Sequence, residues 1–158
     1  FGGPKQVYER ILPYLMLMGD FIIYSGKCGS GQLMKALNNV VYNINIAAIS
    51  ETLPVAVKLG LDPKKLAKLF TSASSRSFAA EHFIPKMLSR DFLGDYSMNL
   101  AYKDIQNVRD ATADFSSAMP VFNSMVQTYE EAIKTGLGDE SKNAMLKVYE
   151  RKLGLKIK

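Results

Sequence analysis

The stretch that decides the fold is Gly31–Leu59, GQLMKALNNVVYNINIAAISETLPVAVKL. Its apolar residues recur at helical spacing and occur nearly all round the helix, which is typical of a helix buried among others. At about 1.5 Å per residue this helix is on the order of 40 Å long, enough to cross a domain. Pro54 is expected to bend it, because the ring removes a backbone donor and clashes with the preceding turn. Gly60 is expected to end it as a C-cap.

Helical spacing continues on both sides of this stretch. Asp62 and Pro63 form a typical helix start, with a capping carboxylate followed by a proline in the first turn. Residues 21–24 form a short, extended-looking piece, and no alternating run predicts a sheet-forming strand. The further helices are expected over about residues 4–16, 62–72, 83–88, 97–117, 120–136 and 141–153. The sequence therefore predicts one all-α domain over residues 1–158, with several helices around one long central helix.

Composition and charge exclude several classes of protein. The single cysteine, Cys28, rules out an internal disulfide and fits a reducing compartment such as the cytoplasm. The apolar run 40–49 is too short for a membrane span and contains two asparagines. The net charge of +5 is spread along the chain, without an RNA-binding aromatic motif or zinc-finger spacing. We therefore expect neither a membrane nor a nucleic acid as partner.

The most informative segment for function is Gly26–Asn39, GKCGSGQLMKALNN. A phosphate-binding P-loop needs lysine and then serine or threonine after its last glycine, and Gln32 and Leu33 occupy those places. The Rossmann fingerprint also fails, because Met34 stands where its third glycine belongs. What remains is a glycine-rich turn that leads into a helix. Such glycines allow the backbone to lie close against a ligand or a second domain.

Lys35, Asn39 and Asn43 follow this turn at intervals of four residues. Four residues advance a helix by about 400°, so the three side chains form one polar stripe on an otherwise apolar helix. A lysine between apolar neighbours is costly unless it serves a polar cavity. Spacing alone leaves another interpretation open, in which Lys35 extends to the surface and the asparagines pair with neighbouring helices.

The string Gly26-x-x-Gly29-x-Gly31-x-x-x-Lys35-x-x-x-Asn39 resembles the catalytic signature of the β-hydroxyacid dehydrogenase family. This family includes 3-hydroxyisobutyrate dehydrogenase, tartronate semialdehyde reductase and the glyoxylate/succinic semialdehyde reductases. Other segments that resemble the family are Gly2-Gly3, at the end of a substrate-loop motif, the Lys-Asp motif at Lys103-Asp104, and Gly136-x-Gly138-Asp139. The chain departs from the pattern at Phe1, where the family commonly has serine.

The resemblance implies a helical C-terminal domain similar to that of 6-phosphogluconate dehydrogenase. In the family this domain follows an N-terminal Rossmann domain, which residues 1–158 lack. The implied cofactor is NAD or NADP, bound mainly by that missing domain. The implied reaction interconverts a small 3-hydroxy acid and its semialdehyde by hydride transfer. We expect residues 1–158 to be inactive alone, and the protein to be a homodimer.

The resemblance also assigns roles to individual residues. Lys35 is the general acid/base, and Asn39 orients the substrate or the lysine. Lysine suits this role where desolvation makes its amine less basic. Lys103 is expected near the cofactor, and no metal is required. The residues expected to bind the substrate are Gly2, Gly3, Gly29, Ser30 and Gly31.

Two alternatives belong to other functional classes. One is a non-catalytic helical module that dimerises through apolar faces, and the other is a weak nucleic-acid binder. A lysine placed between apolar neighbours favours the dehydrogenase over the first, and the scatter of basic residues disfavours the second. His82 and Cys28 are interpreted as structural or simply exposed.

Overall fold

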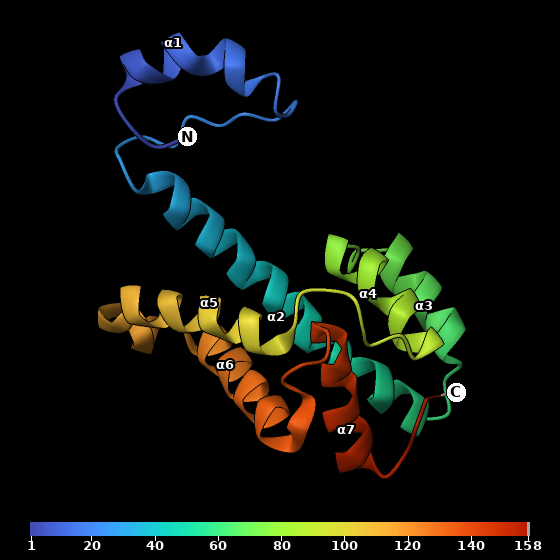
Figure 1. Ribbon diagram of the computed structural model, residues 1–158. Helices are drawn as coiled ribbons and strands as arrows, with labels where there is room; N and C mark the ends of the chain where they lie inside the picture. Colours follow the sequence, from blue (N-terminus) through green and yellow to red (C-terminus); the bar gives the residue numbers. More distant parts are fainter. Residues whose placement is uncertain (158) are drawn as a thin grey trace. The chain divides into compact units, whose positions relative to one another are not determined.

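The computed structural model describes residues 1–157, which are mostly helical (Figure 1). Within these residues the only β pairing is an isolated bridge between Ser97 and Ser141, and the all-α prediction is confirmed. The α-helices are α1 (Lys5–Leu15), α2 (Ser30–Lys58), α3 (Pro63–Ser72), α4 (Phe78–Ser89), α5 (Met98–Ala111), α6 (Pro120–Ala132) and α7 (Leu146–Leu153). The shorter turns are the 3-10 helices η1 (Ala113–Ala118) and η3 (Lys142–Met145) and the π-helical turn η2 (Ile133–Leu137).

The chain packs as two compact units, which we call unit 1 (residues 1–39) and unit 2 (from residue 40 onward). Unit 1 contains α1, the loop after it and the first turns of α2. Unit 2 contains the rest of α2 and all later helices. Each unit is described by itself.

Helix α2 begins and ends within one residue of the predicted bounds. Gly60 has a left-handed φ of 86°, and the N–H of Leu61 donates to the carbonyl of Ala56 at 3.0 Å. These are the features of a glycine C-cap, which confirms the expected end of the helix. The helix continues through Pro54, which is buried.

Helix α2 is long and apolar enough, by length and composition alone, to cross a membrane, and it is the only such helix within residues 1–157. The run 40–49 is too short by itself, but the whole helix is not. Half of its most apolar 18-residue window is buried inside the protein. Since the core helix of a soluble protein meets the same criterion, the finding is weak evidence for a membrane span.

The prediction that α2 is buried nearly all round is correct only for its unit 2 part. The side chains of Ile46 and Leu53 are fully buried there. In the first turns, Leu33, Met34 and Leu37 are exposed. The apolar pattern therefore reported a core for the second half of the helix and an uncovered surface for the first half.

In unit 2, α3 and α4 pack against each other, as do α5 and α6, and Figure 1 shows these two pairs on opposite sides of α2. Side-chain oxygens cap the starts of three helices. Asp62 accepts from the N–H of Lys64 at 2.8 Å, and Ser77 and Ser97 cap α4 and α5 in the same way. The predicted cap at Asp62 is confirmed, because an Ncap oxygen satisfies donors that the first turn leaves free.

Three predicted helices are interrupted near one end. The helix expected over 97–117 stops at Ala111, where the hydroxyl of Thr112 donates to the carbonyl of Val108 at 2.8 Å and η1 follows. The helix expected over 120–136 ends in the π-helical turn, where Gly136 has a φ of 87°. The last helix begins as η3 rather than as a regular α-helix. Local side-chain bonding and a left-handed glycine break these helices, and neither changes the periodicity of the sequence.

One buried hydrogen bond joins α2 to α6. The hydroxyl of Tyr129 donates to Asn43 Oδ1 at 2.9 Å, and both side chains are buried. Burial raises the pKa of Tyr129, so this hydroxyl keeps its proton and remains a donor. Asn43, predicted as part of the polar stripe, therefore has a structural partner.

We predict that Tyr129→Phe lowers the free energy of unfolding by about 1–2 kcal/mol, because it leaves a buried amide oxygen without a donor. Urea denaturation of both proteins measures the difference. Tyr149→Phe is the control: its hydroxyl lies 3.4 Å from that of Thr128 and is only partly buried, so we expect a loss below about 0.5 kcal/mol. Equal losses in the two variants would contradict the prediction.

Candidate functional site

In unit 1 the first three residues lie against the loop that precedes α2. The N–H of Gly3 donates to the carbonyl of Gly26 at 2.7 Å, and the N–H of Ser25 donates to the carbonyl of Phe1 at 2.8 Å. The hydroxyl of Tyr24 adds a bond to the carbonyl of Gly3 at 3.0 Å. The extended-looking piece predicted near residues 21–24 thus leads into a segment that holds the Gly-Gly pair in place.

Gly2 lies directly against the first turn of α2. A Cβ atom on Gly2 would stand 2.8 Å from the carbonyl oxygen of Lys27 and 2.9 Å from the nitrogen of Gly31. A Cβ on Gly31 would in turn stand 3.3 Å from the nitrogen of Gly2. Gly26 and Gly29 have left-handed φ values of 101° and 88°. Glycine is required here for close approach and for backbone conformation, so the structure brings the predicted substrate-loop glycines together.

Lys35 and Asn39 follow on the same helix, one and two turns after Gly31. Lys35 is exposed, which corrects the expectation that its side chain lies between apolar neighbours. Asn39 is half-buried. Within residues 1–157 neither side chain has a hydrogen-bond partner, so both polar groups are available to a ligand.

Lys103, the predicted cofactor residue, lies on α5 in unit 2 and is exposed. The hydroxyl of Tyr96 donates to Asp104 Oδ2, beside it, at 3.1 Å. Partial burial and this carboxylate raise the pKa of Tyr96. The Lys-Asp motif therefore has its carboxylate fixed by a tyrosine and its lysine free.

A second lysine in unit 2 escaped sequence analysis. Lys142, at the start of η3, is only 6% exposed, and its ammonium lies over the ring of Tyr42 at 4.2 Å from the centroid. The rings of Phe83 and Tyr96 lie at 5.7 and 5.8 Å. We call Lys142 and these three rings the lysine–aromatic cluster. Burial lowers the pKa of Lys142 from its ordinary 10.5 to about 8, against the attraction of Asp95 and Asp104.

The acidic neighbour of this cluster is already occupied. Asp95 Oδ2 accepts a hydrogen bond from Lys86 and lies 3.2 Å from Nε2 of His82. The hydrogen bond from Lys86 lowers the pKa of Asp95 more than any other contact does. The ring of His82 also stacks on Phe78, with centroids 5.5 Å apart. His82 is thus held by a carboxylate and a ring, in agreement with its interpretation as structural.

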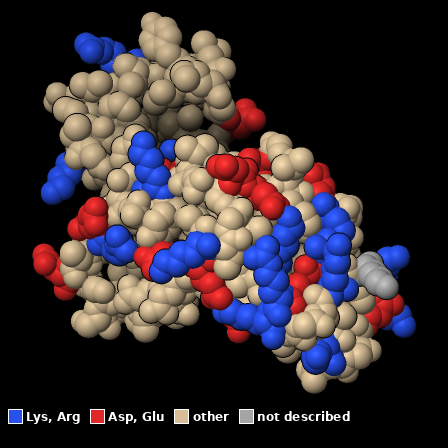
Figure 2. All heavy atoms as spheres, turned by 60° about the horizontal axis from the view of Figure 1, so that its bottom comes forward, with Lys and Arg blue, Asp and Glu red and all other residues tan. Residues whose placement is uncertain are grey.

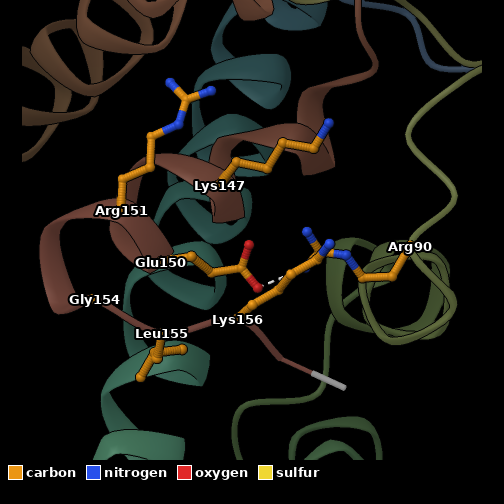
Figure 3. Close-up of a pocket in the computed structure, with 7 residues that line it drawn as sticks. All are labelled: Arg90, Lys147, Glu150, Arg151, Gly154, Leu155 and Lys156. Atoms are coloured by element: carbon orange, nitrogen blue, oxygen red, sulfur yellow. Dashed lines mark hydrogen bonds and ion pairs between the residues drawn. The ribbon is translucent and has the colours of Figure 1, made fainter.

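A basic pocket of about 660 Å³ lies at the other end of η3 and α7 (Figure 3). Its lining residues are Arg90, Lys147, Glu150, Arg151, Gly154, Leu155 and Lys156. Most of its cations already have partners. Arg90 pairs with Glu150 at 2.5 Å, Lys147 with Glu140, and Arg151 donates to the carbonyl of Thr135. Figure 2 shows acidic side chains interspersed among the basic ones, as in an ordinary solvated surface.

Within residues 1–157, no three His, Cys, Asp or Glu side chains form a group that could hold a metal ion. Lys142 was missed because its neighbours Ser141 and Asn143 make the segment look like a polar loop. The only signal available was the apolar run that follows it, and that run does not say which side of the turn is buried.

A helical fold in which a glycine loop opens a long helix bearing lysine and asparagine is the helical domain of a hydroxyacid dehydrogenase. A family model described as NAD-binding of NADP-dependent 3-hydroxyisobutyrate dehydrogenase matches residues 29–149. The chain belongs to the 3-hydroxyisobutyrate dehydrogenase family, within the β-hydroxyacid dehydrogenases. The resemblance stated from the sequence is confirmed.

Among similar proteins, 2-(hydroxymethyl)glutarate dehydrogenase of Eubacterium barkeri is 32% identical over 157 residues, covering 99% of this chain and 52% of that protein. The mitochondrial 3-hydroxyisobutyrate dehydrogenase of Drosophila melanogaster is 28% identical, covering 88% and 45%. The structure of Mycobacterium tuberculosis 3-hydroxyisobutyrate dehydrogenase with L-serine matches with a TM-score of 0.81 and 27% identity, covering 93% and 53%. The chain spans about half the length of the relatives it matches.

We predict that Lys142→Met stabilises the protein at pH 7 by about 1–3 kcal/mol, because it removes a buried ammonium. The pKa of Lys142 is about 8 in the folded protein and ordinarily 10.5, so the folded state binds fewer protons between these values. The cost of burial is therefore full below about pH 8 and disappears as the pH rises toward 10.5.

Urea denaturation of both proteins at several pH values between 7 and 10 measures this difference. The advantage of Lys142→Met is expected to shrink as the pH rises. Lys134→Met, which replaces an exposed lysine of η2, is the control and should show no such trend. A variant that is less stable than the wild type at pH 7 would contradict the prediction.

Proposed function

We propose that this chain is the catalytic, substrate-binding half of an NAD(P)-dependent dehydrogenase that interconverts a small 3-hydroxy acid and its semialdehyde. The observation that carries the proposal is the close packing of Gly2 against the first turn of α2, with Lys35 and Asn39 in the next two turns. Family membership supports the class of reaction.

The glycine loop accounts for substrate binding in this proposal. Gly2, Gly3, Gly29, Ser30 and Gly31 present backbone groups at the start of α2, where free N–H groups and the helix dipole favour an anion. The substrate carboxylate is held there. Phe1 stands where the family commonly has serine, so backbone groups replace one hydroxyl in this contact.

Lys35 is the general acid/base. Its neutral amine accepts the hydroxyl proton during oxidation, and its ammonium returns a proton and stabilises the alkoxide during reduction. Asn39 has both a donor and an acceptor, and it orients the substrate hydroxyl or Lys35. Both side chains lack partners within residues 1–157, which supports these roles.

The cofactor is NAD or NADP, and its nicotinamide supplies the hydride acceptor. Residues 1–158 contain no Rossmann glycine fingerprint, so they do not fit the whole cofactor. We place most of its binding in an N-terminal Rossmann domain outside these residues, and the chain alone is then inactive. Relatives of about twice the length support this division. Lys103 contributes a contact to the cofactor.

The names of the relatives support the substrate class. 2-(Hydroxymethyl)glutarate, 3-hydroxyisobutyrate and L-serine all contain a CH₂OH group on the carbon next to a carboxylate. They differ only in the third substituent on that carbon. We propose that the substrate of this protein shares the CH₂OH and carboxylate groups.

The proposal extends to assembly and compartment. Leu33, Leu37 and Val41 are exposed at intervals of four on α2, and this apolar stripe supports a homodimer. Cys28 is a free, exposed thiol, which supports a reducing compartment such as the cytoplasm.

We predict that Lys35→Ala in the complete protein lowers the turnover rate by about 10²–10⁴-fold, the usual loss for an acid/base group. Lys35→Arg should not restore activity, because a guanidinium keeps its proton. Steady-state kinetics with 3-hydroxyisobutyrate and NAD or NADP measures both rates. Lys5→Ala, on the exposed side of α1, is the control. Near wild-type turnover in either Lys35 variant would exclude Lys35 as the base.

We predict that Lys103→Ala weakens cofactor binding by about tenfold and changes turnover at saturating cofactor by less than about twofold. Removing one charge-assisted contact to the cofactor accounts for this pattern. Cofactor titration by fluorescence gives the dissociation constant, and kinetics at saturation gives the rate. An unchanged dissociation constant would make Lys103 an ordinary surface residue.

A further inference from the structure

Two charged side chains are buried among residues 1–157, and their surroundings differ greatly. Glu150 accepts from Arg90 at 2.5 Å and from the N–H of Ile157 at 2.8 Å. Lys142 has no hydrogen bond and no carboxylate within ion-pair distance among the described residues. Removing a charge from water without a partner is costly, so native proteins rarely retain such a group without a use.

The ring faces around Lys142 replace only part of its hydration. Cation–π attraction over Tyr42 stabilises the ammonium, but a ring face does not accept the three N–H hydrogen bonds of a lysine. The neighbouring carboxylates are engaged elsewhere, since Asp95 pairs with Lys86 and Asp104 binds Tyr96. The donors of Lys142 therefore remain unused.

Other polar groups at this place also lack partners. The hydroxyl of Tyr42 makes no hydrogen bond among residues 1–157. The buried Ser141 Oγ and Asn143 Oδ1, on either side of Lys142, lack partners as well. The cluster has an open side, because Tyr96 is 47% exposed while Phe83 is buried. A small ligand thus has a route to the ammonium along the Tyr96 ring.

We propose that the lysine–aromatic cluster is a binding site for a carboxylate of a small organic acid, with Lys142 as its cationic anchor. The chemistry of the cluster selects this class. One ammonium matches one carboxylate charge, and the apolar rings of Tyr42, Phe83 and Tyr96 suit the methylene groups next to it. A phosphate dianion requires more donors than this site has.

The carboxylate has two possible sources. It belongs either to the third substituent of the substrate, which rests on the function proposed above, or to a separate organic acid. In both cases the site contains the same anchor, and the binding experiment does not depend on turnover. Its failure is therefore distinguishable from failure of the proposed function.

The test is calorimetric titration of the complete protein with glutarate, using butyrate and inorganic phosphate for comparison. We expect glutarate to bind, and Lys142→Met to weaken its binding by at least about tenfold. The matched control Lys134→Met should stay within about twofold. Because Lys142→Met is expected to be more stable than the wild type, lost binding does not reflect unfolding. Phosphate binding that exceeds glutarate binding would overturn the choice of ligand class.

Kinetics distinguishes the two sources. Competitive inhibition by glutarate against a hydroxy acid assigns the carboxylate to the substrate, and non-competitive inhibition assigns it to a separate acid. Each pattern supports the site when Lys142→Met abolishes the inhibition. Unchanged glutarate affinity in Lys142→Met, or no glutarate binding to the wild type at about 10 mM, would overturn the proposal.

Discussion

The constraint on which the rest of the structure depends is the fixed angular step of α2. Because four residues turn a helix by about 400°, Lys35, Asn39 and Asn43 must share one stripe. The stripe passes through three environments: Lys35 is exposed, Asn39 is half-buried, and Asn43 is buried and bound by Tyr129. The same 29-residue helix therefore presents polar groups to a ligand at one end and fastens the core at the other.

The close approach at the start of α2 depends on the same helix. Gly2 contacts the helix backbone at a point where any larger residue would collide with Lys27 or Gly31. Such contacts fix the chain before α1 relative to the first turn of α2. They also explain why glycine stands at residues 2 and 31, where neither has a left-handed conformation to accommodate. Close packing and not backbone freedom is the requirement at these two positions.

Periodicity and capping rules predicted most of the fold. The bounds of α2, the glycine end at Gly60 and the cap at Asp62 follow from local chemistry, which the sequence displays directly. The breaks near Thr112 and Gly136 were not predicted, since one depends on a side-chain bond and the other on a single dihedral angle. The exposure of Lys35 was also missed, because an apolar pattern does not distinguish a core from an uncovered surface.

The candidate site shows a similar division between what a motif records and what only packing reveals. The glycine–lysine–asparagine string is local, so it is visible in the sequence and identifies the family and its chemistry. Lys142 becomes unusual only when Tyr42, Phe83 and Tyr96, from three distant parts of the chain, enclose it. Residues that carry out a shared reaction are expected in the motif, and residues that select among related substrates are expected in such non-local contacts. A buried, unpaired cation outside the motif is therefore where differences in substrate among relatives should be sought.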